Sequence, residues 1–555
     1  MAVARKSKTG ADRRRGKSRR TFRVPQASGE VAAARRPARR AVEAMLAELK
    51  RRLREIGDLN AAAAVLSWDQ STYMPQGGAP ARGRQLSMLR RLAHERSVDP
   101  ALGQLLDALA PRAGELHETD ASLLRVARRD FEKAVRLPPE FVARFAAHTS
   151  ESYDVWTRAR PGNDFAAVRP YLEKTVELSR EYAGYFTPYE SILDPFIDDA
   201  DEGMTAAAVR RLFAELKREL VPLVRAIVAQ PPVDARCLEG TFPEPGQLAF
   251  SRAVVQALGY DFSRGRLDKT PHPFCTRFAS GDVRITTRVN ERDLGDALFS
   301  TIHEAGHALY EQGVEQSLDG TPLGSGVSAG IHESQSRLWE NIVARSEGFW
   351  RHFYPLLQQT FGHFRSVPFD AFVRAVNKVE RSLIRTDADE VTYNLHIMLR
   401  FDLECDLLEG RLAVKDLPEA WRAAMQADLG LIPPDDRSGC LQDVHWYAGP
   451  VGGAFQSYTI GNVLSAQFMQ AALAAHPEIP QEIESGHFAT LHRWLRENLY
   501  RHGRKYPPGE LIERATGRPM TPEPYLAYLR QKFGRLYALP ESFRARAGGP
   551  RTRNP

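Results

Sequence analysis

The chain has 555 residues, 43% of them apolar, so it is long enough to bury a large core and needs no disulfide staples. Its 40 glycines and 36 prolines are near average usage, which excludes collagen-like and wholly disordered chains. No run of residues approaches the roughly 18 apolar positions of a membrane-spanning helix, so no membrane insertion is expected. The formal net charge of +7 would suit a nucleic-acid-binding protein only if it were spread over the body of the chain.

The positive charge is concentrated in residues 1–40. This segment holds 14 Lys and Arg against two acidic residues, a net charge of +12, so the rest of the chain carries −5. It is too polar to bury surface, and we expect a disordered extension that is at most a loose anchor for anionic partners, with no specific nucleic-acid function. Ser18–Phe22 is like the start of a twin-arginine export signal, but no apolar run follows, which favours a solvated extension over an export or transit signal.

Residues 41–543 are predicted to form one large, mainly α-helical domain. Apolar residues recur at helical spacing through most of this segment, and Pro/Gly-rich loops separate the helices without forming a long linker. Val283–Val289 is rich in β-branched residues and predicts a strand, so strands are a minority. Residues 544–555 are expected to be a frayed, basic end.

The most informative segment contains the pattern H-E-x-x-H at His303, Glu304 and His307. Apolar residues around it recur at the spacing of one helix face, so we expect a helix that begins after Leu294–Gly295. On a helix the two histidines are one turn apart, about 5–6 Å, and both imidazoles can converge on one Zn²⁺. Glu304 then points alongside the metal. The alternative is two ordinary histidines on a structural helix.

A catalytic zinc site needs a third protein ligand. Glu311, on the same helix, is roughly 12 Å along the axis from His303 and is expected to be solvated. The glycine-rich loop Gly324–Gly330 lets the chain double back closely, and a second helix that carries Glu333 and Glu340 follows it. Spacing favours Glu333 over Glu340 only weakly.

Several further segments resemble, in the same order along the chain, those of the carboxypeptidase Taq family of zinc metallocarboxypeptidases. Besides the H-E-x-x-H helix, the segments that carry the resemblance are Leu66–Gln70 with Met74–Pro75, His272–Phe274, Asp282–Arg288, His332–Asn341, Ile384–Ile397 and Gly439–Trp446. Together they span about residues 45–540, so the chain is identified as a member of this family. The basic N-terminal segment falls outside the resemblance.

The resemblance implies a mainly α-helical, zinc oligopeptidase-like fold, with a deep active-site cleft and a small β-sheet beside the metal site, and it implies a homodimer. It also implies that His303, His307 and Glu333 hold one Zn²⁺ per subunit, with other divalent ions such as Co²⁺ as alternatives. Glu304 is then the catalytic carboxylate, which takes a proton from the attacking water and passes it to the departing amine.

Further roles follow from the same segments. The tetrahedral intermediate of peptide hydrolysis needs donors, and similar zinc peptidases place a histidine and a tyrosine where this chain has His445 and Tyr458. The alternatives are a buried structural histidine and a packing tyrosine. A free substrate C-terminus needs an arginine fork, for which Arg385 is the first candidate and Arg400 the second. His272 resembles a pocket residue of the family, with a simple turn as the alternative.

We therefore expect a zinc-dependent carboxypeptidase that releases single amino acids, with broad specificity, from peptides that have a free C-terminus. The strand Val283–Val289 is expected to pair with the extended substrate, which would tolerate many side chains. An endo-oligopeptidase with the same chemistry is the near alternative, and a nonenzymatic nucleic-acid or membrane-surface binder acting through residues 1–40 is the distant one. Four widely spaced cysteines without a C-x-x-C pair favour a reducing, cytoplasmic location.

Overall fold

The computed structural model describes residues 28–544 of the chain. Residues 1–27 of the predicted extension and residues 545–555 of the predicted frayed end lie outside the described residues. Helix α1 begins at Ser28, so helical structure starts before residue 41, where the sequence places the start of the domain. The rest of the predicted domain division stays a prediction. Within the described part, none of the helices combines the length and the apolar character needed to cross a bilayer.

The part of the chain before the sheet is helical. Its helices are α1 (Ser28–Thr72), α2 (Ala79–Ser97), α3 (Pro100–Leu109), α4 (Glu118–Arg136), α5 (Pro139–Ala159), α6 (Phe165–Gly184), α7 (Asp194–Ala200), α8 (Ala206–Val228) and α9 (Glu244–Leu258). Local sequence explains several of the starts, because the side chains of Asp99, Asp164 and Thr205 accept backbone N–H groups in the first turns of α3, α6 and α8.

The part of the chain after the sheet is also helical. Its helices are α10 (Leu294–Gly313), α11 (Ala329–Arg337), α12 (Glu347–Thr360), α13 (Phe369–Val376), α14 (Tyr393–Glu409), α15 (Leu417–Leu429), α16 (His445–Ala448), α17 (Gln456–Ala475), α18 (Ile479–Glu484), α19 (Ala489–Asn498), α20 (Pro508–Thr516), α21 (Glu523–Leu536) and α22 (Glu541–Arg544). A π-helical segment, η5 (Leu338–Val343), continues directly from α11.

Short 3₁₀ helices occupy many of the connections. They are η1 (Gln76–Gly78), η2 (Ala110–Glu115), η3 (Arg236–Leu238), η4 (Gln316–Leu318), η6 (Gly362–Ser366), η7 (Arg385–Asp387), η8 (Val414–Asp416) and η9 (Tyr500–His502). They keep the loops short, so the helices pack as one continuous body with a shared core.

A three-stranded sheet lies beside α10. Its strands are β1 (Leu267–Lys269), β2 (Cys275–Ala279) and β3 (Asp282–Thr287), in the order β1-β3-β2. β3 pairs in parallel with β1 and antiparallel with β2, so both of its edges are already occupied. The strand predicted at Val283–Val289 is therefore present, but it is central, and the expectation that it pairs with the substrate backbone is corrected.

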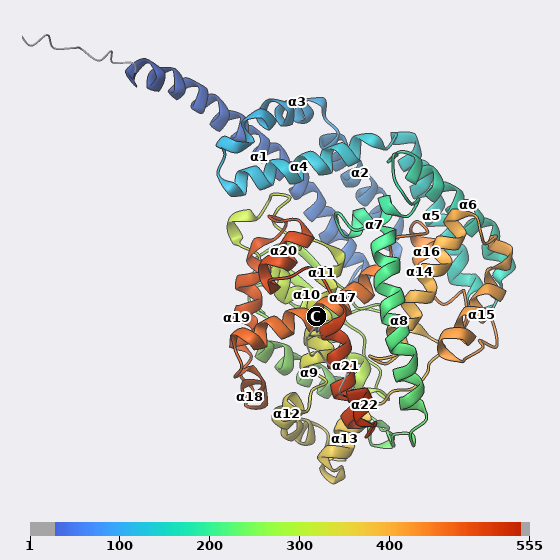
Figure 1. The fold of residues 1–555 in the computed structure, drawn as a ribbon. Coiled ribbons are helices and arrows are strands. Elements are labelled where there is room, and N and C mark those ends of the chain that lie inside the picture. Colours follow the sequence, from blue (N-terminus) through green and yellow to red (C-terminus); the bar gives the residue numbers. More distant parts are fainter. Residues whose placement is uncertain (1–27, 545–555) are drawn as a thin grey trace, which may run out of the picture.

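Three helices occupy the middle of the molecule (Figure 1): α10, α11 and α17, with α11 packed against both of the others. The predicted apolar stripe of α10 is confirmed, because Leu298, Ile302, Ala305 and Leu309 are all buried. α9 and the sheet cover other faces of α10, and α21 packs on α17. The H-E-x-x-H helix is thus held from several sides.

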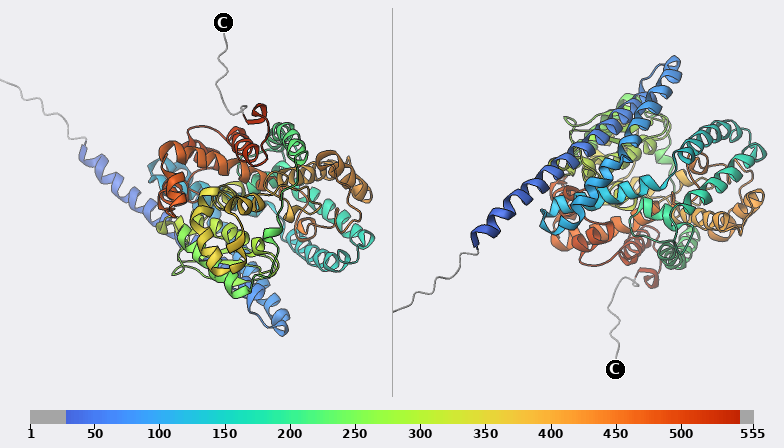
Figure 2. Two further views of the ribbon diagram at one scale, coloured as in Figure 1. Left: turned by 90° about the horizontal axis from the view of Figure 1, so that it is seen from below. Right: turned by 90° about the horizontal axis from the view of Figure 1, so that it is seen from above.

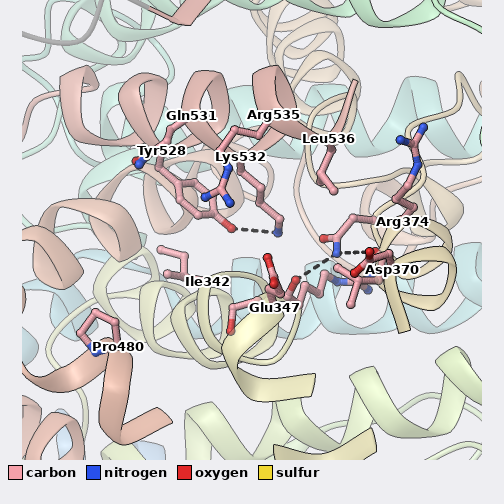
Figure 3. Close-up of a pocket in the computed structure, with 14 residues that line it drawn as sticks. Ile342, Glu347, Asp370, Arg374, Pro480, Tyr528, Gln531, Lys532, Arg535 and Leu536 are labelled. Carbon is pink, nitrogen blue, oxygen red and sulfur yellow. Dashed lines mark hydrogen bonds between the residues drawn. The ribbon is translucent and has the colours of Figure 1, made fainter. Parts of the chain in front are cut away.

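The long helix α1 runs across one side of the body, with α2 packed against it (Figure 2). Helices α5, α6, α14 and α15 lie together on another side of the molecule (Figure 1). The predicted mainly α-helical fold with a small sheet beside the site is confirmed. Two cavities, of about 640 Å³ (Figure 3) and about 340 Å³, are not lined by the predicted metal ligands, so the predicted active-site cleft stays a prediction.

Candidate metal centre

Helix α10 presents His303 and His307 from consecutive turns. Asp293 precedes the helix, and its Oδ1 accepts the N–H groups of Gly295 and Asp296 at 2.8 and 3.3 Å, which fixes where the helix begins. Gly306, between the two histidines, faces α11 closely: a Cβ there would lie 2.6 Å from the carbonyl oxygen of Gln335. The glycine therefore lets α11 approach the histidine face of α10.

Helix α11 brings Glu333 to that face. The Ser328 hydroxyl accepts the N–H of Ile331 at 3.3 Å and caps the helix at the end of the glycine-rich loop. On the other side, α17 passes so close that a Cβ on Gly461 would lie 2.5 Å from Cγ of Glu333. The aliphatic part of the Glu333 side chain thus packs directly on the α17 backbone at Gly461, and the side chain is 7% exposed.

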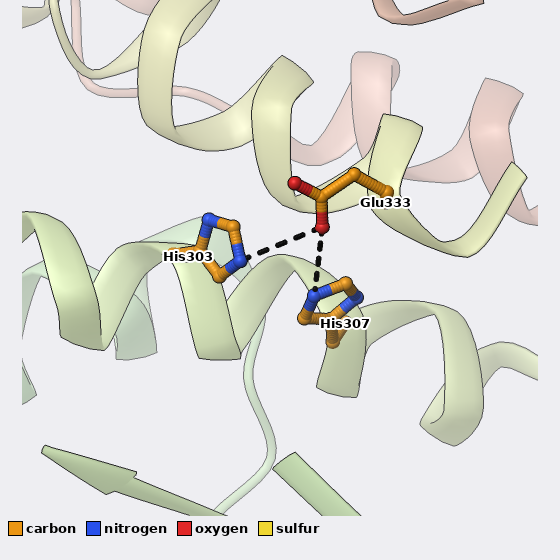
Figure 4. A group of neighbouring side chains, drawn as sticks. All are labelled: His303, His307 and Glu333. Carbon is orange, nitrogen blue, oxygen red and sulfur yellow. Dashed lines mark ion pairs between the residues drawn. The ribbon is translucent and has the colours of Figure 1, made fainter. Parts of the chain in front are cut away.

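His303, His307 and Glu333 converge on one point (Figure 4), and one ligand atom from each lies within 4.8 Å of the others. Glu333 Oε2 is 3.6 Å from Nε2 of His303 and 3.4 Å from Nε2 of His307. Two atoms bonded to one tetrahedral zinc at about 2.0–2.1 Å lie roughly 3.4 Å apart, so this spacing fits such an ion. Two imidazoles and one carboxylate are also the donor set of many catalytic zinc sites.

The Nδ1 atoms of both histidines are engaged on the far side of the rings. His303 Nδ1 donates to Glu340 Oε2 at 2.9 Å, and His307 Nδ1 donates to the carbonyl oxygen of His332 at 3.1 Å. Because a carboxylate and a carbonyl can only accept, these bonds favour the tautomer whose Nε2 lone pair faces the metal position. Glu340, which the sequence offers as an alternative metal ligand, instead contacts His303 on the side of the ring that faces away from the metal position.

Arg337 joins the two carboxylates. Its Nε lies 2.6 Å from Glu333 Oε1, and its Nη1 lies 3.4 Å from Glu340 Oε2. Burial opposes ionisation of Glu340, but Arg337 and the hydrogen bond from His303 outweigh it and hold its pKa at about 2. Burial is likewise outweighed at Glu333, whose pKa is held below its ordinary value by Arg337 and the histidines. Both carboxylates are therefore ionised, and Glu333 Oε2, which also accepts the Ser336 hydroxyl at 3.0 Å, faces the metal position.

Glu304 lies between the two histidines in sequence and is 7% exposed. Burial raises its pKa to about 7, with the neighbouring Glu333 contributing in the same direction and His303 opposing. A carboxylate with a pKa near neutrality can both accept and return a proton at physiological pH. That property suits the proton transfer predicted for it.

His445 and Tyr458 lie together. His445 Nε2 is 3.2 Å from the Tyr458 hydroxyl, so one hydrogen bond joins the two predicted donors. Burial lowers the pKa of His445 to about 4 and raises the pKa of Tyr458 above its ordinary value, so both groups are neutral near pH 7. A neutral phenol and a neutral imidazole can each donate a hydrogen bond.

Arg385 is held beside this pair. Its Nε donates to Asp443 Oδ1 at 2.9 Å and its Nη1 donates to the Tyr393 hydroxyl at 3.0 Å, and the guanidinium lies 5.3 Å from the centre of the Tyr458 ring. Tyr393 also contacts the metal centre, because the Arg337 guanidinium lies 4.5 Å from the centre of the Tyr393 ring. The structure thus links Arg385 to Glu333 through two side chains.

Arg400 and His272 lie differently from what was expected. The Arg400 side chain is 0% exposed, and its three guanidinium nitrogens donate to Asp443, His396 and Gln442 at 2.6–2.7 Å. Its fully buried side chain holds Asp443, the partner of Arg385, and its predicted substrate-binding role stays a prediction. His272 lies exposed between β1 and β2, with no ion pair or hydrogen bond to the rest of the described chain. Its role stays a prediction.

Two residues around the metal position, Glu311 and Arg337, are not among the predicted site residues. Glu311, expected to be solvated, is buried and lies 2.9 Å from Nε2 of His332. Arg337 is the second, and a signal for it exists: Glu333, Arg337 and Glu340 recur at i, i+4 and i+7, the spacing of charged side chains on one helix face.

A mainly helical body around an H-E-x-x-H helix, with a carboxylate from a second helix, defines a helical metallopeptidase. The model of the carboxypeptidase Taq (M32) metallopeptidase family matches residues 48–533. The chain is 40% identical over 496 residues to thermostable carboxypeptidase 1 of Thermus thermophilus, covering 87% of this chain and 97% of that protein. It is 36% identical over 489 residues to carboxypeptidase 1 of Bacillus subtilis, covering 88% and 97%.

A solved structure agrees with these relatives. The crystal structure of an M32 carboxypeptidase from Deinococcus radiodurans superposes with a TM-score of 0.87 at 54% identity, covering 89% of this chain and 100% of that chain. The chain belongs to the carboxypeptidase Taq (M32) family of metallopeptidases. It is therefore a carboxypeptidase, a peptide hydrolase that depends on a divalent metal, and the resemblance found in its motifs is confirmed.

Proposed function

We propose that this chain is a zinc carboxypeptidase that removes single amino acids from the C-termini of peptides, with broad side-chain tolerance. The observation that carries the proposal is the spacing of 3.4 and 3.6 Å between Glu333 Oε2 and the two histidine nitrogens. That spacing and the donor set favour Zn²⁺, although the same atoms can hold a related ion such as Co²⁺.

The proposed roles follow the geometry. When bound, the ion supplies Lewis acidity, which polarises the scissile carbonyl and acidifies the attacking water. Glu304, buried beside the two histidines, takes the proton of that water at its carboxylate and returns it to the departing amine. His445 and Tyr458 donate hydrogen bonds to the oxygen on which negative charge develops.

Arg385 is the proposed clamp for the substrate's terminal carboxylate. Asp443 and Tyr393 occupy its Nε and Nη1, which orients the guanidinium rigidly and leaves Nη2 without a hydrogen-bond partner in residues 28–544. A clamp on the main-chain carboxylate selects a free C-terminus rather than a particular side chain, which supports broad specificity. Arg385 donates and the carboxylate accepts, so an amidated C-terminus would bind poorly.

The test combines metal content with product analysis. Zinc-loaded wild type incubated with an unstructured peptide should give a ladder of products that lose one residue at a time from the C-terminus, read by mass spectrometry. Glu304→Gln should retain near-stoichiometric zinc while its activity falls by at least about 10², whereas His303→Ala should lose both. Internal cleavage products would favour the endo-oligopeptidase, and ordinary turnover by Glu304→Gln would refute the role of Glu304.

The proposal also covers the oligomeric state, the cellular location and the basic N-terminal segment. The family resemblance supports a homodimer, which light scattering of the purified protein tests. The four cysteines, Cys237, Cys275, Cys405 and Cys440, are free thiols, which supports a reducing cytoplasmic location. The charge of residues 1–40 supports at most a salt-sensitive attraction to anionic partners, and it supports no separate binding function.

A further inference from the structure

A cavity with mixed polar and apolar walls begins at Ile342 in η5 and is not lined by the proposed metal ligands. It has a volume of about 640 Å³ and is walled by residues from the end of η5, from α12 and α13, and from α21. That volume is in the range of small-molecule sites. Nothing in the proposed peptide hydrolysis uses this cavity.

Charged side chains of both signs line the cavity. Figure 3 shows Lys532 and Arg535 on α21 at one side, with Glu347 and Asp370 on the facing side. In all, four cations and two carboxylates line it, the remaining cations being Arg345 and Arg374. A phosphate would meet two carboxylates there, and a simple cation would meet four positive groups. A molecule with both charges finds a partner for each.

Some of these groups are available to a ligand. Arg535 and Asp370 are exposed, and neither makes an ion pair with any other residue between 28 and 544. Asn377, which is 5% exposed, donates to the carbonyl oxygens of Arg345 and Val373 at 3.0 and 2.9 Å, while its Oδ1 has no hydrogen-bond partner among the described residues. Among the described residues, the walls therefore contain a cation and a carboxylate without an ion-pair partner and an amide oxygen without a hydrogen-bond partner.

The same cavity has an apolar floor and sides. Ile342, Val373, Pro480 and Leu536 contribute aliphatic surface between the charged groups. The matching ligand therefore has an ammonium group, a carboxylate and an apolar body. We propose that this cavity binds a free α-amino acid with an apolar side chain, the chemical class that a carboxypeptidase releases at each turnover.

The cavity is connected to the metal centre. Arg345 Nη2, in its wall, lies 3.5 Å from Glu340 Oε1, and the other oxygen of Glu340 accepts the hydrogen bond from His303. Lys532 and Tyr528, also in the wall, donate to the carbonyl oxygen of Asn341, the residue after Glu340. A ligand carboxylate bound at Arg345 competes with Glu340 for the positive charge of Arg345, which weakens the hold of Arg345 on Glu340. Glu340 then binds His303 more strongly, so an occupied cavity slows the release of zinc.

The binding test uses the zinc-loaded enzyme with its metal site filled by a hydroxamate inhibitor, so that the active site cannot bind the product. Calorimetric titration with L-leucine should show one site per chain. Leucinamide, which lacks the carboxylate, and 4-methylpentanoate, which lacks the ammonium group, should each bind at least about tenfold more weakly. Equal binding of 4-methylpentanoate or of inorganic phosphate would overturn the proposal in favour of a simple anion site.

Two exposed variants locate the site. Arg535→Glu and Asp370→Lys should each weaken leucine binding by at least about tenfold, while the matched control Arg496→Glu, on the exposed face of α19, should bind as wild type does. Unchanged binding in both cavity variants would overturn the location. The inference rests on the proposed release of single amino acids, but this titration needs no turnover, so its failure is distinguishable from failure of the proposed function.

The link to the metal is tested by the rate at which a chromophoric chelator removes zinc. Saturating leucine should slow this rate at least about threefold more in wild type than in Arg535→Glu, since both proteins keep the active site and only the variant loses the cavity. Equal slowing in the two proteins would refute the connection through Arg345 and Glu340.

Discussion

Glu340 is the residue whose removal tests most sharply how the metal centre is built. It binds no metal in our assignment, yet its Oε2 accepts the hydrogen bond from Nδ1 of His303 at 2.9 Å. Its pKa of about 2 keeps it charged at every working pH. We expect that Glu340→Ala weakens zinc binding because a proposed ligand loses its orienting partner and a negative charge disappears beside the cation.

The expected magnitude follows from the contact. A hydrogen bond to a charged group contributes about 1.5–3 kcal/mol, which corresponds to roughly 10- to 150-fold in an equilibrium constant. Orienting partners of metal ligands typically contribute 10- to 100-fold, so the two estimates agree. Arg337 and Arg345, at 3.4 and 3.5 Å from Glu340, lose a shared partner and add to the effect.

Competition against a chromophoric chelator measures the zinc affinity directly. Glu340→Ala should bind zinc about 10- to 100-fold more weakly, and Glu340→Gln should recover part of the loss, because its amide oxygen can still accept from His303. Glu497→Gln, an exposed carboxylate on α19, is the matched control. Wild-type zinc affinity in Glu340→Ala would refute the reasoning.

Two further substitutions test the packing and the charge of the core. Gly306→Ala would place a Cβ 2.6 Å from the Gln335 carbonyl oxygen, so we expect a loss of roughly 1–3 kcal/mol in unfolding free energy and weaker zinc binding, measured by denaturant titration and chelator competition. Gly509→Ala, which meets nothing within 4 Å, is its control, and equal stability of the two variants would contradict the close approach of α10 and α11. Burial raises the pKa of Glu404 from 4.5 to about 7, so the folded state binds this proton more tightly than the unfolded state, and Glu404 alone should contribute a decline in stability of up to roughly 3 kcal/mol as pH rises from 4.5 to 7. Glu404→Gln should remove that decline in unfolding experiments across this pH range, and an unchanged pH profile would show that Glu404 is ionised in the folded protein.

The sequence could predict the H-E-x-x-H helix because its chemistry and its apolar stripe lie within one short segment. It could not choose between Glu333 and Glu340 by spacing, since seven residues are close to two helical turns and place both on one face. The structure separates them because the regular helix ends at Arg337 and a π-helical segment carries Glu340 to the far nitrogen of His303. Only the family resemblance chose Glu333 in advance.

Other features depend on contacts between distant segments. Arg385 and Arg400 look alike in sequence, but packing of α14 against its surroundings buries Arg400 completely and leaves Arg385 beside Tyr458. The position of β3 in the middle of the sheet depends on pairing with two short strands that local pattern identifies poorly. The cavity between α13 and α21 is lined by residues more than a hundred positions apart in the sequence, so no local sequence pattern predicts it.

The most direct test of the central claim compares one peptide in two forms, with a free C-terminus and with an amidated one. Wild type should strongly prefer the free form. Arg385→Ala should lose most of that preference while it still binds zinc, with kcat/KM for the free peptide reduced roughly 30-fold to several-thousand-fold. Arg385→Lys should recover only part, because an ammonium cannot form two parallel hydrogen bonds. Equal hydrolysis of both peptides by the wild type would contradict the account and identify an endo-oligopeptidase.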